Sequence, residues 1–153
     1  MSSDGADLSL ICRVRGGLCA LPLRHVTETM RPLPIEVVAG APHFVLGLAV
    51  IRGIPTPVVD AARLLGHADT ASGRWIALTV GSRQVALAVD SVLGVRPLPT
   101  NVRHALPPLL KDANRDLVSE LGLLDEALLL VLQGGHLLSD DDWARLELGS
   151  AIA

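Results

Sequence analysis

The sequence predicts a mainly β fold built from two five-stranded lobes with short helices. Short apolar runs bounded by glycine or proline recur about every ten residues, a spacing typical of β-sandwiches and barrels. The two halves of the chain repeat the same order of runs, and few stretches have helical periodicity. With 153 residues, the chain has the length of one domain or of two small lobes that share a core.

The expected strands follow the apolar runs in order. Gly16-Gly17 and Gly81 separate consecutive runs, and glycine allows the positive φ angles of a tight hairpin turn. Only Phe44, Trp75 and Trp143 are aromatic, so we expect an aliphatic core. The ten expected strands are residues 8–15, 18–22, 28–32, 44–51, 56–59, 74–80, 84–90, 93–98, 118–124 and 127–132.

Two short helices are expected from capping signals. Residues 60–65 end at Gly66, which can act as a C-cap. Residues 139–148 begin with Ser139 as N-cap, and the three aspartates that follow complement the helix dipole. We interpret the acidic run as a capping device, because a calcium loop needs alternating ligands and a glycine that are absent here.

The internal repeat organises the chain into two halves. Residues 20–26 align with residues 86–92, and residues 44–65 align without gaps with residues 117–138, which places Arg52-Gly53 opposite Asp125-Glu126. We expect one lobe over about 18–66 and another over about 74–138, joined by the loop 67–73, with strands exchanged near the lobe boundaries. A lobe of about 70 residues has a marginal core, so the two should pack together as one unit.

Charge and hydropathy exclude several classes of protein. The net charge is −3 and no block of Lys or Arg occurs, which argues against nucleic-acid binding. No secretory signal and no uninterrupted run of 18 apolar residues is visible, so we expect a cytoplasmic protein without direct membrane insertion. Cys12 and Cys19 flank a predicted hairpin turn and could form a disulfide, but two buried thiols are the favoured interpretation.

Residues with catalytic or metal-binding potential do not form a known pattern. The five histidines are scattered without metal-ligand spacing, and the glycine pairs do not form a phosphate-binding loop. Asp60 and Asp90 both follow apolar strands, where a turn or cap is a better interpretation than an acid–base pair. We therefore predict no enzymatic activity, no metal and no cofactor.

Six motifs, in order and with matching gaps from about Leu8 to Leu138, resemble the CheW family of chemotaxis coupling proteins. The resemblance implies two intertwined SH3-like five-stranded barrels and a single CheW-like domain over 8–148, with residues 1–7 as a flexible N-terminus. It also implies a non-enzymatic adaptor that joins the regulatory domain of a CheA-type histidine kinase to the cytoplasmic signalling tips of chemoreceptors in membrane-associated arrays. The motifs are residues 20–22, Val26 with Glu28, residues 41–47, Arg52-Gly53 with residues 57–60, residues 85–92, and residues 121–125 with 128–132.

The candidate partner-binding residues come from this resemblance. Arg52 matches the family arginine that supports kinase and receptor coupling, and its guanidinium can make several fixed hydrogen bonds to a partner. The alternative to partner binding for Arg52 is that it only pairs with a local carboxylate such as Asp60. For Val26 and Val85, the alternative is that they only pack in the core. The full set of candidate residues is Val26, Glu28, Gly47, Arg52, Gly53 and Val85.

One position departs from the family pattern. The family commonly has asparagine two residues before the arginine, and this chain has Val50 there. The difference leaves open a divergent, non-flagellar chemosensory pathway. A separate alternative is a different protein-interaction module, or a β module that holds a small ligand in the groove between the lobes. The sequence identifies neither the receptor nor the kinase.

Overall fold

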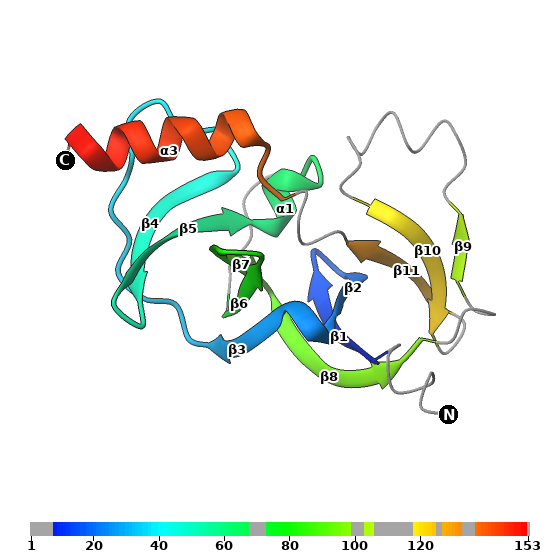
Figure 1. The fold of residues 1–153 in the computed structure, drawn as a ribbon. Helices are drawn as coiled ribbons and strands as arrows, with labels where there is room; N and C mark the ends of the chain where they lie inside the picture. The colour runs from blue at the N-terminus through cyan, green and yellow to red at the C-terminus, as the bar shows by residue number, and fades with distance from the viewer. Residues whose placement is uncertain are drawn as a thin grey trace.

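The strands form two curved sheets that lie side by side (Figure 1). The computed structural model describes residues 8–67, 73–98, 103–105, 118–124, 127–132 and 137–152. The mainly β prediction is confirmed. The six-stranded sheet has the order β8 (Ser91–Pro97), β1 (Leu8–Val14), β2 (Gly17–Pro22), β11 (Ala127–Leu132), β10 (Val118–Leu124) and β9 (Arg103–Ala105). The five-stranded sheet has the order β3 (Val26–Met30), β6 (Arg74–Val80), β7 (Arg83–Val89), β5 (Ile54–Asp60) and β4 (Val45–Ile51).

The repeat seen in the sequence is present in the topology. The two sheets are related by replacing β1 and β2 with β6 and β7, β8 with β3, and β10 and β11 with β4 and β5. In the five-stranded sheet, Val58 of β5 pairs with Ala86 of the parallel strand β7. The residues that the repeat predicts to be equivalent, Val131 of β11 and Ala20 of β2, also form a parallel pair. The aligned turn Asp125-Glu126 lies outside the described residues.

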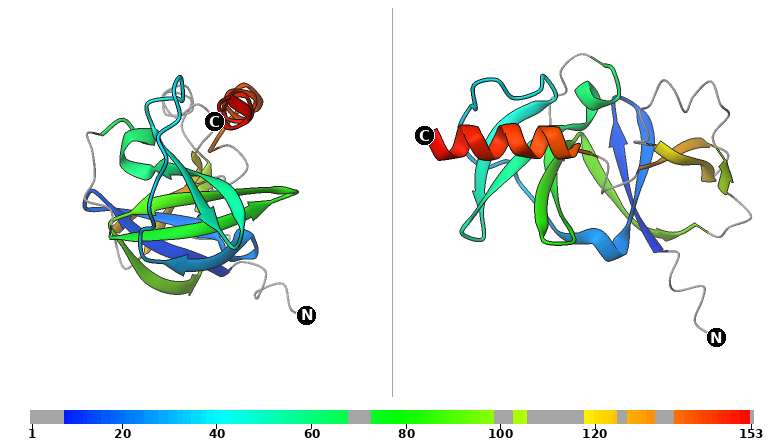
Figure 2. Two further views of the ribbon diagram at one scale, coloured as in Figure 1. Left: turned by 90° about the vertical axis from the view of Figure 1, so that its left-hand side faces the viewer. Right: turned by 45° about the horizontal axis from the view of Figure 1, so that its top comes forward.

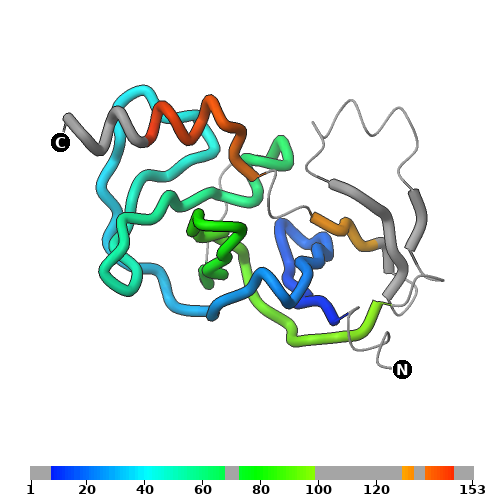
Figure 3. The backbone as a smooth tube through the Cα atoms, viewed as in Figure 1, coloured from blue at the N-terminus to red at the C-terminus, as the bar shows by residue number. Residues whose placement is uncertain are grey.

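The hairpins that open the two halves of the chain are exchanged between the sheets. The first hairpin, β1–β2, pairs with β8 and β11, whereas the second hairpin, β6–β7, pairs with β3 and β5. Figure 3 shows the resulting path, in which the chain passes from one lobe to the other between β2 and β3 and returns at β8. The two hairpins have similar apolar patterns, so the sequence did not indicate which sheet each would complete.

Several element bounds also differ from the prediction. β3 begins at Val26 and β5 at Ile54, both two residues earlier than expected, and the short strand β9 was not expected at all. With β9, one sheet has six strands instead of five. Residues 1–7, predicted to be flexible, lie outside the described residues.

In the described part of the chain, the helical segments that accompany the sheets are η2 (Leu23–His25), α1 (Ala61–Leu64) and α3 (Asp140–Ile152). Ser139 precedes α3, as predicted, and its hydroxyl accepts a hydrogen bond from the Asp142 amide while Asp142 accepts one from the Ser139 amide. α3 lies against the lobe of the five-stranded sheet (Figure 2). There Arg83 contacts Asp140 at 3.0 Å and lies over the ring of Trp143. Among the described residues, no helix is long and apolar enough to span a membrane.

The largest cluster of buried side chains combines both sheets with α3. Alternate residues of β7 face opposite sides of the sheet, so Leu87 belongs to this shared core and Ala86 to a second cluster around Trp75. Burial against the shared core fixes the register of β7, since a slip by one residue would reverse both faces. Core packing therefore fixes the strands from which the turns of the five-stranded sheet project. Shared-core residues from both sheets and α3 include Leu10, Cys19, Leu21, Val59, Ile76, Leu78, Val85, Leu87, Leu132 and Leu146.

Candidate functional site

Arg52 lies at the tip of the hairpin that joins β4 to β5. Ile51 and Ile54 are paired across the hairpin, so Arg52 and Gly53 form a two-residue turn. Both turn residues have positive φ angles, 54° and 77°, as the type I′ turn of a twisted hairpin requires. Gly53 adopts this conformation without steric cost, and Arg52 projects from the tip with 74% of its side chain exposed.

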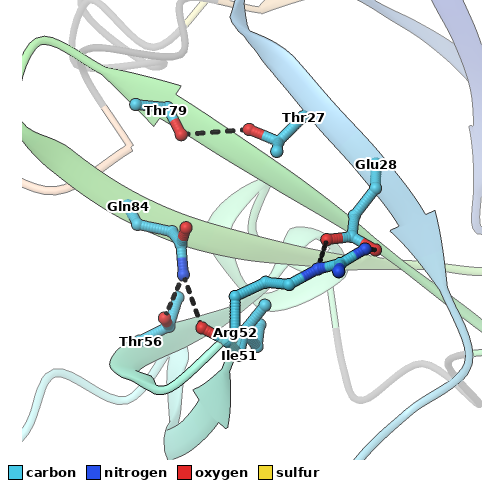
Figure 4. Close-up of polar contacts among 7 residues, drawn as sticks. All are labelled: Thr27, Glu28, Ile51, Arg52, Thr56, Thr79 and Gln84. Carbon is cyan, nitrogen blue, oxygen red and sulfur yellow. Dashed lines mark hydrogen bonds and ion pairs between the residues drawn. The ribbon is translucent and has the colours of Figure 1, made fainter.

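The guanidinium of Arg52 binds the carboxylate of Glu28 through two hydrogen bonds (Figure 4). Nε donates to Oε2 at 2.8 Å and an Nη donates to Oε1 at 3.1 Å. Glu28 lies on β3, whereas Arg52 follows β4, and these strands are the opposite edges of the five-stranded sheet. The ion pair therefore closes the curled sheet on itself. Glu28 and Arg52 were separate candidates for partner binding in the sequence, and in the structure they contact each other.

The ion pair changes the protonation equilibria of both groups. The hydrogen bonds and the positive charge of Arg52 lower the pKa of the Glu28 carboxyl below its ordinary value. The hydrogen bonds and the charge of Glu28 likewise raise the pKa of Arg52. Both side chains are therefore charged at neutral pH, and the pair is accessible to a charged partner.

Val26 lies two residues before Glu28, on the same edge strand. The pairing of β3 with β6 shifts between Val26 and Glu28, so Thr27 is the extra residue of a β-bulge. The hydroxyl of Thr27 lies 3.0 Å from that of Thr79 on β6. Val26 is half-buried and packs against the shared core, which is the alternative to partner binding given for it above.

Gly47 and Val85 do not lie at the surface with Arg52. Gly47 is buried with a φ of 147°, and a Cβ there would overlap the carbonyl group of Glu36 and lie 2.6 Å from Cγ2 of Ile35. Val85 is 3% exposed and belongs to the shared core. Their contribution to partner binding stays a prediction. Because both residues are buried, they would contribute by shaping the surface above them and not by touching the partner.

Asp60 and Asp90 both accept hydrogen bonds from backbone amides. Oδ1 of Asp60 accepts a hydrogen bond from the Ala62 amide and caps α1, so the carboxylate that pairs with Arg52 is Glu28 and not Asp60. Oδ2 of Asp90 accepts a hydrogen bond from the Arg15 amide at 2.8 Å. This bond connects the β7–β8 junction to the turn of the β1–β2 hairpin, and hence one sheet to the other.

Sequence reasoning missed the residues that support the turn from beneath. The side-chain amide of Gln84, at the start of β7, donates to the Ile51 carbonyl at 3.3 Å and to the Thr56 hydroxyl at 2.7 Å. The Thr56 hydroxyl in turn donates to the Ile54 carbonyl at 2.9 Å. A threonine among the apolar residues at the start of β5 was the available signal, but its partner depends on the parallel pairing of β5 with β7.

No cluster of three or more potential metal ligands occurs in the described part of the chain. Cys12 and Cys19 face each other across the β1–β2 hairpin as free, buried thiols. Burial raises the pKa of both thiols above the ordinary value, that of Cys19 to about 12. Buried thiols with raised pKa values are poor nucleophiles and poor ligands.

Comparisons with known proteins agree with this architecture. The sequence model of the family described as CheW-like domain matches residues 9–142. The chain is 32% identical over 93 residues to Protein FrzA of Myxococcus xanthus, which covers 59% of this chain and 57% of FrzA, less than two thirds of that protein. It is 25% identical over 113 residues to Chemotaxis protein CheW of Klebsiella aerogenes, which covers 72% of this chain and 68% of that protein.

A solved structure confirms the fold. The scaffolding protein TtCheW from Thermoanaerobacter tengcongensis superposes with a TM-score of 0.79 over 90% of each chain, at 20% sequence identity. The family match extends over most of the chain and includes both lobes, Glu28 and the Arg52 turn. The chain therefore belongs to the family of proteins with a CheW-like domain.

Proposed function

We propose that the protein is a non-catalytic adaptor that couples a CheA-type histidine kinase to the cytoplasmic signalling tips of chemoreceptors. The observation that supports this most directly is the CheW-like family match over residues 9–142. The names of two similar proteins, Chemotaxis protein CheW and scaffolding protein TtCheW, agree with an adaptor role. The protein would act on the cytoplasmic side, where its partners hold it at the membrane.

The surface around Arg52 has the chemistry of a protein contact. Arg52 is exposed at the tip, and the apolar side chains of Val50 and Ile54 beside it are 65% and 49% exposed. A guanidinium has five N–H donors, and Glu28 occupies only part of them. The remaining donors can bind a carboxylate or backbone carbonyls of a partner, while Val50 and Ile54 supply apolar area.

Binding titrations with each partner test the proposal. The regulatory domain of the kinase and a receptor signalling fragment are titrated separately with wild type, with Arg52→Ala and with Arg145→Ala as the matched control. Arg145 is an exposed arginine on α3, so its removal changes the net charge equally at a different place. We expect wild type and Arg145→Ala to bind both partners, and Arg52→Ala to bind at least one of them about tenfold more weakly. Failure of the wild type to bind either partner would contradict the proposed function.

A further inference from the structure

We infer that Gln84 and Thr56 are a positioning pair, which holds the β4–β5 turn in the conformation that allows Arg52 to bind Glu28. Neither residue was among the candidate site residues, and neither touches Arg52 or Glu28 through a hydrogen bond. The consequence for partner binding rests on the proposed function, whereas the positioning role rests on contacts within the chain.

The pair holds both ends of the turn. The Arg52-Gly53 turn is bounded by the carbonyl groups of Ile51 and Ile54. Gln84 binds the first carbonyl directly and the second through the hydroxyl of Thr56. A single amide group on β7 therefore restrains both strands where they enter and leave the turn.

The donors and acceptors of Gln84 and Thr56 match the hydrogen bonds that the two side chains make. A glutamine amide has two N–H donors, and Gln84 directs them to the Ile51 carbonyl and the Thr56 oxygen. The single hydroxyl proton of Thr56 goes to the Ile54 carbonyl, which leaves the Thr56 oxygen free to accept from Gln84. Thr56 is fully buried, so loss of this network would leave a polar group unsatisfied away from water.

The same contacts form a closed circuit around one end of the sheet (Figure 4). Thr27 on β3 contacts Thr79 on β6, and Thr79 is the cross-strand partner of Gln84 on β7. Gln84 restrains the turn through the network described above, and Arg52 returns from the turn to Glu28 on β3. Because Arg52 is the more exposed member of the ion pair, with 74% of its side chain exposed, the position of its backbone decides whether its guanidinium reaches Glu28.

Position 50 does not supply this restraint. The side chain of Val50 is apolar and 65% exposed, so it points to solvent and cannot bind the turn. Support from the adjacent strand β7 takes the place of a polar side chain within the hairpin. A firmly held arginine loses less conformational freedom on binding, so the positioning pair favours partner binding through preorganisation.

The pKa of Glu28, measured by NMR on its carboxyl carbon, reports whether Arg52 is in place. Arg52→Ala gives the value of the unpaired carboxyl. We expect Gln84→Met and Thr56→Val, which remove the network with little change in volume, to raise the Glu28 pKa by at least half of that difference. Thr56→Ser keeps the hydroxyl and should restore the wild-type value. Ser91→Ala removes a hydroxyl from β8, in the other sheet and outside this circuit, and should leave the Glu28 pKa unchanged.

An unchanged Glu28 pKa in Gln84→Met would overturn the inference, as would a Gln84→Met chain that fails to fold, since Gln84 would then serve the whole fold. Binding titrations on the same variants separate this inference from the proposed function. If wild type binds neither partner while the Glu28 pKa responds as expected, the proposed function fails and the positioning role stands. If wild type binds both partners and the Glu28 pKa does not respond, the positioning role fails alone.

Discussion

Among the glycines whose surroundings the structure describes, Gly47 is the one where a single added methyl group should damage the structure most. It is buried in β4 and pairs across the hairpin with Val58, and the segment at Ile35 and Glu36 crosses over it. In Gly47→Ala, the new Cβ would overlap the Glu36 carbonyl group and lie 2.6 Å from Cγ2 of Ile35. The crossing segment would have to move away, because most of the obstruction is backbone.

The expected cost follows from what this movement breaks. Glu36 and Leu48 exchange two backbone hydrogen bonds of 2.8 Å, and each contributes about 0.5–1.5 kcal/mol net. A non-glycine residue at the φ of Gly47, 147°, adds strain of about 1–3 kcal/mol. The free energy of unfolding should therefore fall by about 2–6 kcal/mol in total. For a chain of this size the midpoint of thermal unfolding should fall by roughly 5–20 °C.

Denaturant and thermal unfolding, followed by circular dichroism, measure this change. Gly81→Ala is the matched control, since Gly81 has a positive φ of 63° but nothing within 4 Å of the added Cβ. It should lose only about 1–2 kcal/mol, the cost of a left-handed alanine. If Gly47→Ala is no less stable than Gly81→Ala, the close approach of Glu36 is not what requires glycine at position 47, and the reasoning is refuted.

Three further predictions concern pH, the thiols and the shared core. Because Arg52 lowers the folded-state pKa of Glu28, the ion pair should be complete above the ordinary value of 4.5 and be lost as the pH falls through the lowered pKa. Partner binding should fall over the same range, and Glu28→Gln should remove this dependence. Cys12 and Cys19, with raised pKa values, should resist alkylation at pH 8 until the protein unfolds, and rapid labelling of the native protein would contradict their burial. Leu87→Ala should cost about 2–5 kcal/mol in urea titrations, because this fully buried side chain fills the shared core, and a loss below about 1 kcal/mol would contradict that packing.

Much of the secondary structure was predictable from local patterns. Apolar runs with glycine turns located ten of the eleven strands within the described residues, and Ser139 with its aspartates located the start of α3. The strand missed, β9, has only three residues and lacks an apolar run. The repeat was predictable for the same reason, since its two alignments depend only on the spacing of runs along the chain.

Contacts between strands distant in sequence were not predictable in the same way. Glu28 and Arg52 were both proposed as site residues, yet their pairing depends on a sheet that curls until its edge strands meet. The support from Gln84 depends on the exchange of hairpins, because β7 comes from the other half of the chain. Either hairpin could have completed either sheet by its apolar pattern, so local signals do not determine this choice.

The central claim, that the protein bridges a kinase and a receptor, is tested most directly by a three-component capture experiment. A receptor signalling fragment is immobilised, and retention of the kinase regulatory domain is measured with and without this protein. We expect the kinase domain to be retained only when the wild-type protein is present. Arg145→Ala should support the same retention, and Arg52→Ala should reduce it about tenfold. Equal retention of the kinase domain with and without the wild-type protein would contradict the bridging role.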